Sequence, residues 1–230
     1  ISSFIRNHKK ALSIVDCVTS IGACNVPVDE WDLDIVASGS QKGYMIPPGL
    51  SFVSMSEKAW QASENSNLPK FYLNLKSYKK SLSSNSNPYT PAVNLVFALD
   101  ESLKMMKDEG LDEIFKRHKR HKLAVSEAAK SLNLKLFADE ENLSPSVTAI
   151  QIEDIDAENF RKIIKNKYDI LLAGGQDHLK GKIFRVGHLG YVNDRDIISV
   201  IAAIGNTLIE LNKISTEQAG EAIKVASFHL

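Results

Sequence analysis

The chain has 230 residues, of which 43% are apolar and 24% are charged, and this composition is typical of a folded globular protein. Its 28 basic residues are balanced by 28 acidic ones, so no net charge attracts it to nucleic acid or to an anionic membrane. A chain of this length forms one large domain or two smaller ones, and it can bury enough surface to fold without disulfides or a structural metal.

Two further classes of protein are excluded by the pattern of the sequence. The longest dense apolar stretch, residues 197–204, is much shorter than the roughly 20 residues of a membrane-spanning helix. Cys17 and Cys24 lie among apolar residues without further ligands at zinc spacing, so we expect buried thiols and no metal site. We therefore expect a cytoplasmic protein that binds neither membrane nor nucleic acid.

The first third of the chain predicts a mostly parallel sheet. The apolar runs 11–15 and 33–37 end at Asp16 and at the turn 38–40, and a third strand is expected at 51–55. Ligands of open α/β sheets bind beyond the carboxyl ends of the strands. Asp16 and Lys42 are expected at this end of the sheet.

Helices are predicted next. Val96, Leu99, Leu103 and Met106 recur at helical spacing before Gly110, and a second helix is expected over 111–132. This second helix contains the basic run 116–122. The run is compatible with a nucleic-acid patch, but it has no aromatic partners and acidic residues precede it, so we favour a solvated helix face.

The remainder of the chain predicts a smaller α+β unit. A strand is expected at 147–152, a helix at 157–167, a strand at 182–186 and a long helix at 194–211. The sequence thus indicates an α/β unit that is followed by an α+β unit.

Lys42 follows a tight Gly/Ser turn, Ser38-Gly39-Ser40-Gln41. A lysine in this position can point into a cleft, where partial desolvation makes its amine a nucleophile toward a carbonyl group. The alternative is an ordinary loop lysine in solvent. Asp16, at the end of a neighbouring strand, is either a turn-capping residue or a carboxylate that addresses the same ligand. Together, a carboxylate and a lysine at two strand ends fit a pyridoxal phosphate (PLP) site.

Arg185 lies within the apolar strand 182–186, where an unpaired charge is unfavourable. A guanidinium group in this setting binds a carboxylate through two parallel hydrogen bonds. That carboxylate is either part of a ligand or an internal acid in a structural ion pair. His188 is predicted to be structural.

Several segments in register resemble the class V aminotransferases of the alanine–glyoxylate and serine–glyoxylate type. They are VDCVTS at 15–20, SGSQK at 38–42, PPGL at 47–50, SEKAW at 56–60, PYTPAV at 88–93 and the stretch 174–190, which ends in IFRVGHLG. Some cyanobacterial members are labelled small subunit of a soluble hydrogenase. The resemblance implies a PLP-dependent fold type I transferase, with residues 1–107 in the large cofactor domain and 108–230 in the small domain.

The resemblance also implies roles for single residues. Lys42 would hold PLP as a Schiff base and Asp16 would pair with the pyridine nitrogen. Val18 would pack on the ring, and Gln41 would contact the cofactor near its phosphate. Thr90 would reach the phosphate of a neighbouring subunit, which implies a homodimer, and Arg185 would bind the substrate carboxylate. Asn87 stands where some members have a tyrosine, a departure that concerns the phosphate contacts.

The expected reaction is transamination between an amino acid, alanine or serine, and a 2-oxo acid such as glyoxylate. Members of this family begin upstream of Ile1, so we expect the chain to be the carboxyl-terminal part of a longer protein and to bind PLP weakly alone. One alternative is a non-catalytic or truncated partner subunit. Another is a cysteine desulfurase, which needs a reactive cysteine before Arg185, where the segment 174–182 has none.

Overall fold

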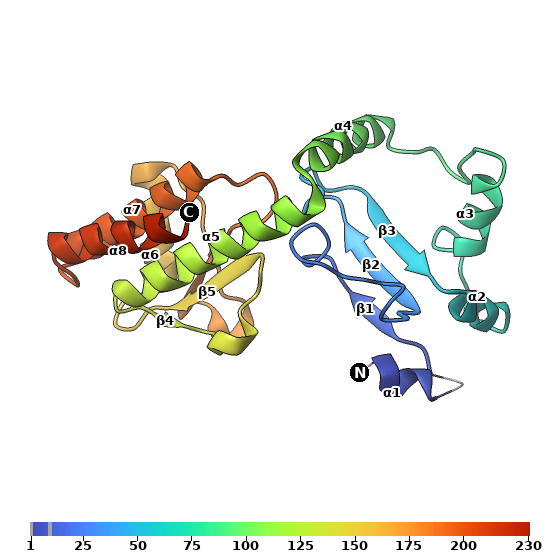
Figure 1. Cartoon of the computed structure of the whole chain (residues 1–230), viewed down its shortest axis with the longest axis horizontal. Helices are drawn as coiled ribbons and strands as arrows, with labels where there is room; N and C mark the ends of the chain where they lie inside the picture. Colours follow the sequence, from blue (N-terminus) through green and yellow to red (C-terminus); the bar gives the residue numbers. More distant parts are fainter. Residues whose placement is uncertain (1, 9–10) are drawn as a thin grey trace. The chain divides into compact units, whose positions relative to one another are not determined.

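The computed structural model describes residues 2–8 and 11–230 (Figure 1). The chain divides into two compact units. The first comprises Ile1–Ile21 and Val26–Asp108, and the second comprises Gly22–Asn25 and Glu109–Leu230. Among the described residues, no helix is long and apolar enough to cross a membrane.

The first unit is built on a three-stranded sheet in the order β1-β2-β3, formed by β1 (Ile14–Asp16), β2 (Ile35–Gly39) and β3 (Ser51–Met55). Strands β1 and β2 are parallel, as expected, whereas β2 and β3 are antiparallel. The expectation of a mostly parallel sheet is therefore wrong for the strands described here. The loop from Gly39 to Ser51 is too short for the crossover that a parallel pair requires, so the chain reverses direction.

The helices of the first unit are α1 (Ser2–Arg6), α2 (Glu57–Glu64), α3 (Leu75–Leu82) and α4 (Val93–Glu109). Ser56 begins α2, because its side chain accepts a hydrogen bond from the backbone of Ala59. The prediction of α4 is confirmed, and Gly110 ends it with a φ of +85°, a conformation that favours glycine. The patterns of α2 and α3 were not recognised in the sequence.

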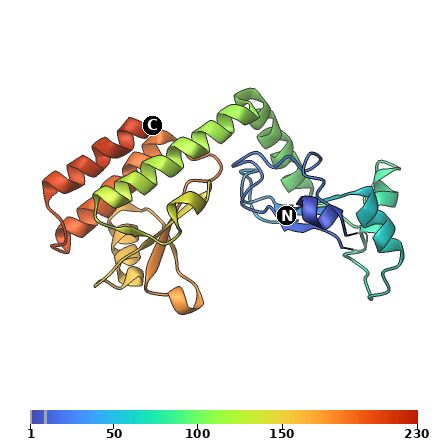
Figure 2. The ribbon, with the colours of Figure 1, turned by 60° about the horizontal axis from the view of Figure 1, so that its bottom comes forward.

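The second unit combines an antiparallel sheet, in the order β4-β5-β7-β6, with helices. Its elements are α5 (Leu111–Ser131), β4 (Lys135–Leu136), β5 (Val147–Gln151), α6 (Ala157–Tyr168), β6 (Ala173–Gly174), β7 (Ile183–Gly187), α7 (Asp194–Glu210) and α8 (Thr216–His229), with short 3₁₀ turns at Glu140–Asn142 and Asp177–Leu179. The α+β prediction is confirmed. Helices α5, α7 and α8 lie side by side (Figure 2).

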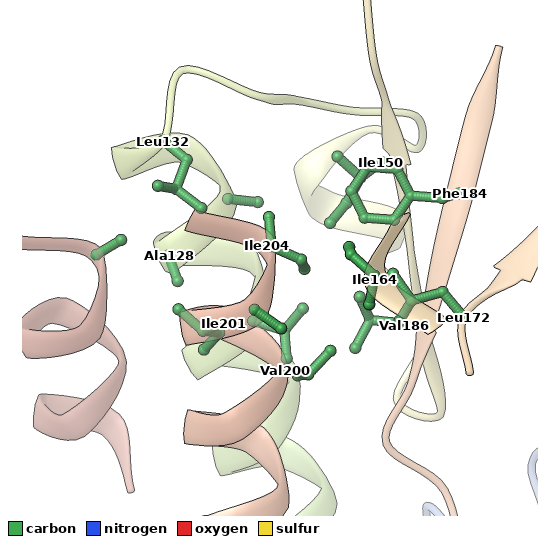
Figure 3. Close-up of a cluster of buried hydrophobic side chains, with 14 of the residues drawn as sticks. Ala128, Leu132, Ile150, Ile164, Leu172, Phe184, Val186, Val200, Ile201 and Ile204 are labelled. Atoms are coloured by element: carbon green, nitrogen blue, oxygen red, sulfur yellow. The ribbon is translucent and has the colours of Figure 1, made fainter. Parts of the chain in front are cut away.

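One apolar cluster forms the core of the second unit (Figure 3). Helices α5, α6, α7 and α8 contribute to it, together with inward-facing residues of β5 and β7. Phe160 of α6 and Phe184 of β7 are fully buried, with ring centroids 5.1 Å apart. Because Arg185 follows Phe184 directly, its backbone is anchored next to a fully buried side chain of this core.

The basic run of α5 is not a uniformly solvated face. Lys116 and Lys119 are exposed, but His118 and His121 are fully buried. Arg117 is largely covered and forms an ion pair with Glu109. The helical period places every third or fourth residue on the inner face of α5. The prediction that the whole run 116–122 is a solvated face is therefore wrong.

Candidate active site

Asp16 and Lys42 emerge at the same end of the first unit's sheet. Asp16 is the last residue of β1, and Lys42 follows the end of β2 by three residues. The two strands are parallel neighbours, with Asp16 opposite Ala37, so their carboxyl ends share one edge, where α/β proteins bind ligands. We call Asp16, Val18, Gln41 and Lys42 the strand-end site.

Asp16 is exposed and caps its own turn, because its Oδ1 accepts a hydrogen bond of 2.9 Å from the backbone N–H of Val18. This is the turn-capping role that the sequence left open. Within the described part of the chain, no hydrogen bond involves the second oxygen, Oδ2. The turn therefore orients the carboxylate while leaving one oxygen available to a ligand.

A buried serine fixes the loop that carries Lys42. The Ser40 hydroxyl donates to the Pro47 carbonyl at 2.8 Å and accepts from the Leu50 N–H at 3.1 Å, and the Met45 N–H donates to the Lys42 carbonyl. Met45 has a φ of +59°, which is uncommon for a residue with a side chain. This role of Ser40 was not predicted, although its place in the turn between Gly39 and Gln41 is a local signal for it.

The Lys42 side chain is half-buried. In the part of the chain that the structure describes, no carboxylate lies within ion-pair distance of its amine. Gly39 is the last residue of β2, and two side chains lie close to it. A Cβ built on Gly39 would lie 3.2 Å from Gln41 Oε1 and 3.9 Å from Val18 Cγ1. Gly39 thus lets side chains from both strand ends close over the backbone.

Asp34 ties the strands of this site together. Its carboxylate accepts hydrogen bonds from the Ser13 N–H and hydroxyl and from the Ser56 hydroxyl, and it lies 3.5 Å from the Lys58 amine. Burial by itself raises the pKa of Asp34, but these hydrogen bonds and the Lys58 charge outweigh it, so the pKa is below its ordinary value. The network joins the start of β1, the start of β2 and the cap of α2.

Thr90 is an exposed residue between α3 and α4. Among the hydrogen bonds of the described residues, none joins it to Asp16 or Lys42. Its neighbour Tyr89 packs against Phe71 and Tyr72 and donates a hydrogen bond to the Phe71 carbonyl. The backbone before Thr90 is thus held by an aromatic cluster, while Thr90 itself remains accessible.

Arg185 lies in the middle of β7, in the second unit, and is half-buried. Its Nε donates a hydrogen bond of 2.9 Å to the Gly174 carbonyl. No ion pair involves it anywhere in residues 2–8 and 11–230, so the structural ion pair considered from sequence has no partner there. Gly174 belongs to the family-like stretch 174–190, but no local pattern marks it as a partner of Arg185.

The model of the aminotransferase class V family matches residues 1–189, and the chain belongs to this family. The chain is 57% identical over 211 residues to the soluble hydrogenase 42 kDa subunit of Anabaena cylindrica, covering 92% of this chain and 55% of that protein. It is 35% identical to the serine–glyoxylate aminotransferase of Methylorubrum extorquens, covering 92% of this chain and 54% of that protein.

A solved structure, the ureidoglycine–glyoxylate aminotransferase of Bacillus subtilis, superimposes with a TM-score of 0.91 at 30% identity. The match covers 99% of this chain and 60% of that one. The fold is therefore part of the α/β fold of these aminotransferases. The chain spans about half the length of the curated relatives it matches.

The family is PLP-dependent, and the strand-end site fits that cofactor chemically. A pyridine nitrogen needs an acid, which Asp16 offers through its uncommitted Oδ2. An aldehyde needs an amine without a competing carboxylate, and Lys42 meets this condition among the described residues. Val18 Cγ1, which would lie 3.9 Å from a Cβ built on Gly39, presents an apolar group at the same strand end.

Proposed function

We propose that the protein to which this chain belongs transfers an amino group between an amino acid and a 2-oxo acid such as glyoxylate. The observation that carries the proposal is the joint position of Asp16 and Lys42 at the carboxyl ends of two parallel strands. Membership of the aminotransferase family supports the same chemistry.

PLP, when bound, supplies an aldehyde and an electron-withdrawing ring. The Lys42 amine is the group that would hold the cofactor, and it would then move a proton at the substrate α-carbon as general base and acid. Asp16 Oδ2 would hold a proton on the ring nitrogen, since its other oxygen is committed to the turn. Val18 would pack on the ring and Gln41 would contact the cofactor near the phosphate.

Arg185 would bind the substrate α-carboxylate, because a guanidinium group forms two parallel hydrogen bonds with a carboxylate. Thr90 would contact the phosphate of a second subunit in a homodimer. Residues 1–107 would then belong to the cofactor domain and 108–230 to the small domain. Serine and alanine are the proposed amino donors. A relative whose name specifies serine and glyoxylate supports this choice.

The proposal is tested by Lys42→Ala in the full-length protein. We expect loss of the visible absorbance of covalently bound PLP and loss of transamination, because no other amine replaces Lys42 in its turn. Lys107→Ala, on the exposed surface of α4, is the matched control and retains both. Transamination that persists in Lys42→Ala would rule out the assignment.

A non-catalytic partner subunit is the second candidate, and the name of the Anabaena relative favours it. This candidate requires no amino transfer. It is distinguished by mixing the full-length protein with PLP, alanine or serine, and glyoxylate, and by measuring glycine. Formation of glycine that depends on Lys42 supports the enzyme, and its absence supports the partner subunit.

A further inference from the structure

The Arg185 guanidinium is held from one side only. Its Nε donates to the Gly174 carbonyl at 2.9 Å, and no carboxylate of the described chain pairs with its terminal nitrogens. Since Nε is committed, the edge formed by the two terminal nitrogens is the one left for a carboxylate. The direction of this edge is therefore set by where the Gly174 carbonyl lies.

Gly174 belongs to β6, a strand of only two residues that pairs with β7 through Ala173 opposite Arg185 and Gly174 opposite Phe184. A strand this short at the edge of a sheet has little stability of its own. The position of the Gly174 carbonyl therefore depends on contacts with the neighbouring helix α6.

These contacts are made by an ion pair on α6. Arg161 Nε donates to the Leu172 carbonyl at 2.8 Å, just before β6, and its Nη1 donates to both oxygens of Glu158 at 2.8 Å. A Cβ built on Gly174 would lie 2.4 Å from Arg161 Nη1 and 2.6 Å from Glu158 Oε1. The ion pair therefore lies directly against Gly174, where only a glycine leaves room for it.

We propose that Glu158 and Arg161 are positioning residues that hold the Gly174 carbonyl, and through it orient Arg185 for the carboxylate of the substrate. The inference rests on the proposed role of Arg185. The contacts form one series, from Glu158 to Arg161, to the Leu172 carbonyl that precedes β6, along the backbone to Gly174 and then to Arg185. A small rotation of the guanidinium group would replace two parallel hydrogen bonds by one, because its planar fork fits a carboxylate in one orientation.

The test uses Arg161→Met in the full-length protein, which keeps the aliphatic part of the side chain and removes the fork. Lys162→Met, exposed on the same helix, is the matched control. We expect the KM for both the amino acid and the 2-oxo acid to rise about tenfold while kcat and the melting temperature change little, because the ground state and the transition state lose the same interaction. We expect the control to behave as the wild type.

A second readout does not depend on activity. In protein labelled with ¹⁵N-arginine, the Arg185 Nε–H signal is identified by its absence in Arg185→Lys. We expect its hydrogen exchange to accelerate about tenfold in Arg161→Met and to stay unchanged in Lys162→Met, since the accepting carbonyl is no longer held.

Gly174→Ala provides a variant with both charges intact. The φ of Gly174 lies outside the left-handed region, so alanine fits the backbone, and the methyl group displaces only the flexible ends of Arg161 and Glu158. The same rise in KM supports the proposal. An unchanged KM in Arg161→Met and Gly174→Ala, or equal losses of kcat and melting temperature, overturns it. If Arg185→Lys itself leaves KM unchanged, the proposed role of Arg185 fails instead.

Discussion

Asp34 illustrates how a single residue stabilises the framework of the strand-end site. Its carboxylate is buried, yet it accepts three hydrogen bonds from Ser13 and Ser56 and lies near the Lys58 amine. These donors compensate for lost hydration, and hydrogen bonds to a charged group are stronger than neutral ones. The residue acts on the site through the backbone, since it joins the segments that begin β1, β2 and α2.

Asp34→Asn should destabilise the first unit by about 2–3 kcal/mol, because the amide cannot accept from all of these donors. The pKa of Asp34 is lowered in the folded protein. Its contribution is therefore present above the unfolded pKa of about 4 and is lost as the pH falls through the folded value. Urea unfolding should show a difference between wild type and variant at neutral pH that shrinks below about pH 4. The exposed Asp29→Asn serves as control, and an equal difference at every pH would contradict the argument.

The buried histidines of the second unit make a prediction of the same sign as that for Asp34, in a pH range that begins higher. His118 donates through Nδ1 to the Ile114 carbonyl and accepts the Gly190 N–H at Nε2, which is the neutral form. Burial lowers the pKa of His118 and His121, and it lowers the pKa of His188 to about 3. The folded unit therefore keeps these rings neutral where the unfolded chain takes up protons.

The free energy of unfolding of the second unit should fall as the pH decreases from about 6.5, by about 1.4 kcal/mol per pH unit for each such histidine. For His188 this loss continues to about pH 3. Urea unfolding at a series of pH values measures the slope. His188→Gln should flatten it, whereas His178→Gln, at an exposed position, should not. Parallel slopes in all three proteins would refute this explanation.

At the scale of elements, α7 has the most complete start signal of the helices that the structure describes. Asn193 accepts hydrogen bonds from the backbone of Arg195 and Asp196, and the Asp196 side chain accepts the Asn193 N–H in return. This capping box satisfies donors that a helix start leaves unpaired. It also fixes where the chain turns after β7, the strand that carries Arg185.

Asn193→Ala should lower the stability of the second unit by about 1 kcal/mol, because the Arg195 and Asp196 amides lose their acceptor. Asn206→Ala, at an exposed position inside α7, should be neutral or slightly stabilising, since alanine favours helix. Thermal unfolding of the two variants under identical conditions checks the pair. Equal changes of the melting temperature in both variants would contradict the capping role of Asn193.

At the scale of the whole molecule, the two units differ in how they bury apolar surface. The second unit has one core cluster shared by four helices and two strands. In the first unit, the buried cluster described is small, formed by Cys17, Leu33 and Val36. Large apolar side chains are exposed along its segment 68–97, namely Leu68, Phe71, Tyr72, Leu73, Leu82, Val93, Val96 and Phe97. Such a surface is typical of a region that other protein covers.

Limited proteolysis of the 230-residue chain should therefore begin within residues 65–92, where the backbone has few buried contacts, and should leave a stable fragment that contains 111–230. Mass spectrometry of the products over time measures the order of cleavage. First cuts inside α5 or α7 would contradict this view of local stability.

Much of the local structure was predictable from the sequence. The period of the apolar residues located α4 to α7, β3, β5 and β7 within a few residues, because a face that must be buried repeats every 3.6 or every two positions. The shorter helices α2 and α3 were missed, since each has only eight residues and buries little. The direction of β3 follows from the short connection between Gly39 and Ser51 and was open to prediction. The burial of His118 and His121 depends on contacts with Gly190 and Asp194, far along the chain, which no local pattern encodes.

By itself, the sequence determined the family, the order of the elements and the candidate functional residues, because motifs and periodicity are local properties of the chain. Tertiary structure alone decided which atoms remain available. It committed the Nε of Arg185 to Gly174, and it placed the Arg161–Glu158 pair against that glycine. The physical reason is that hydrogen bonds between distant segments depend on positions in space, which are set only when the elements pack.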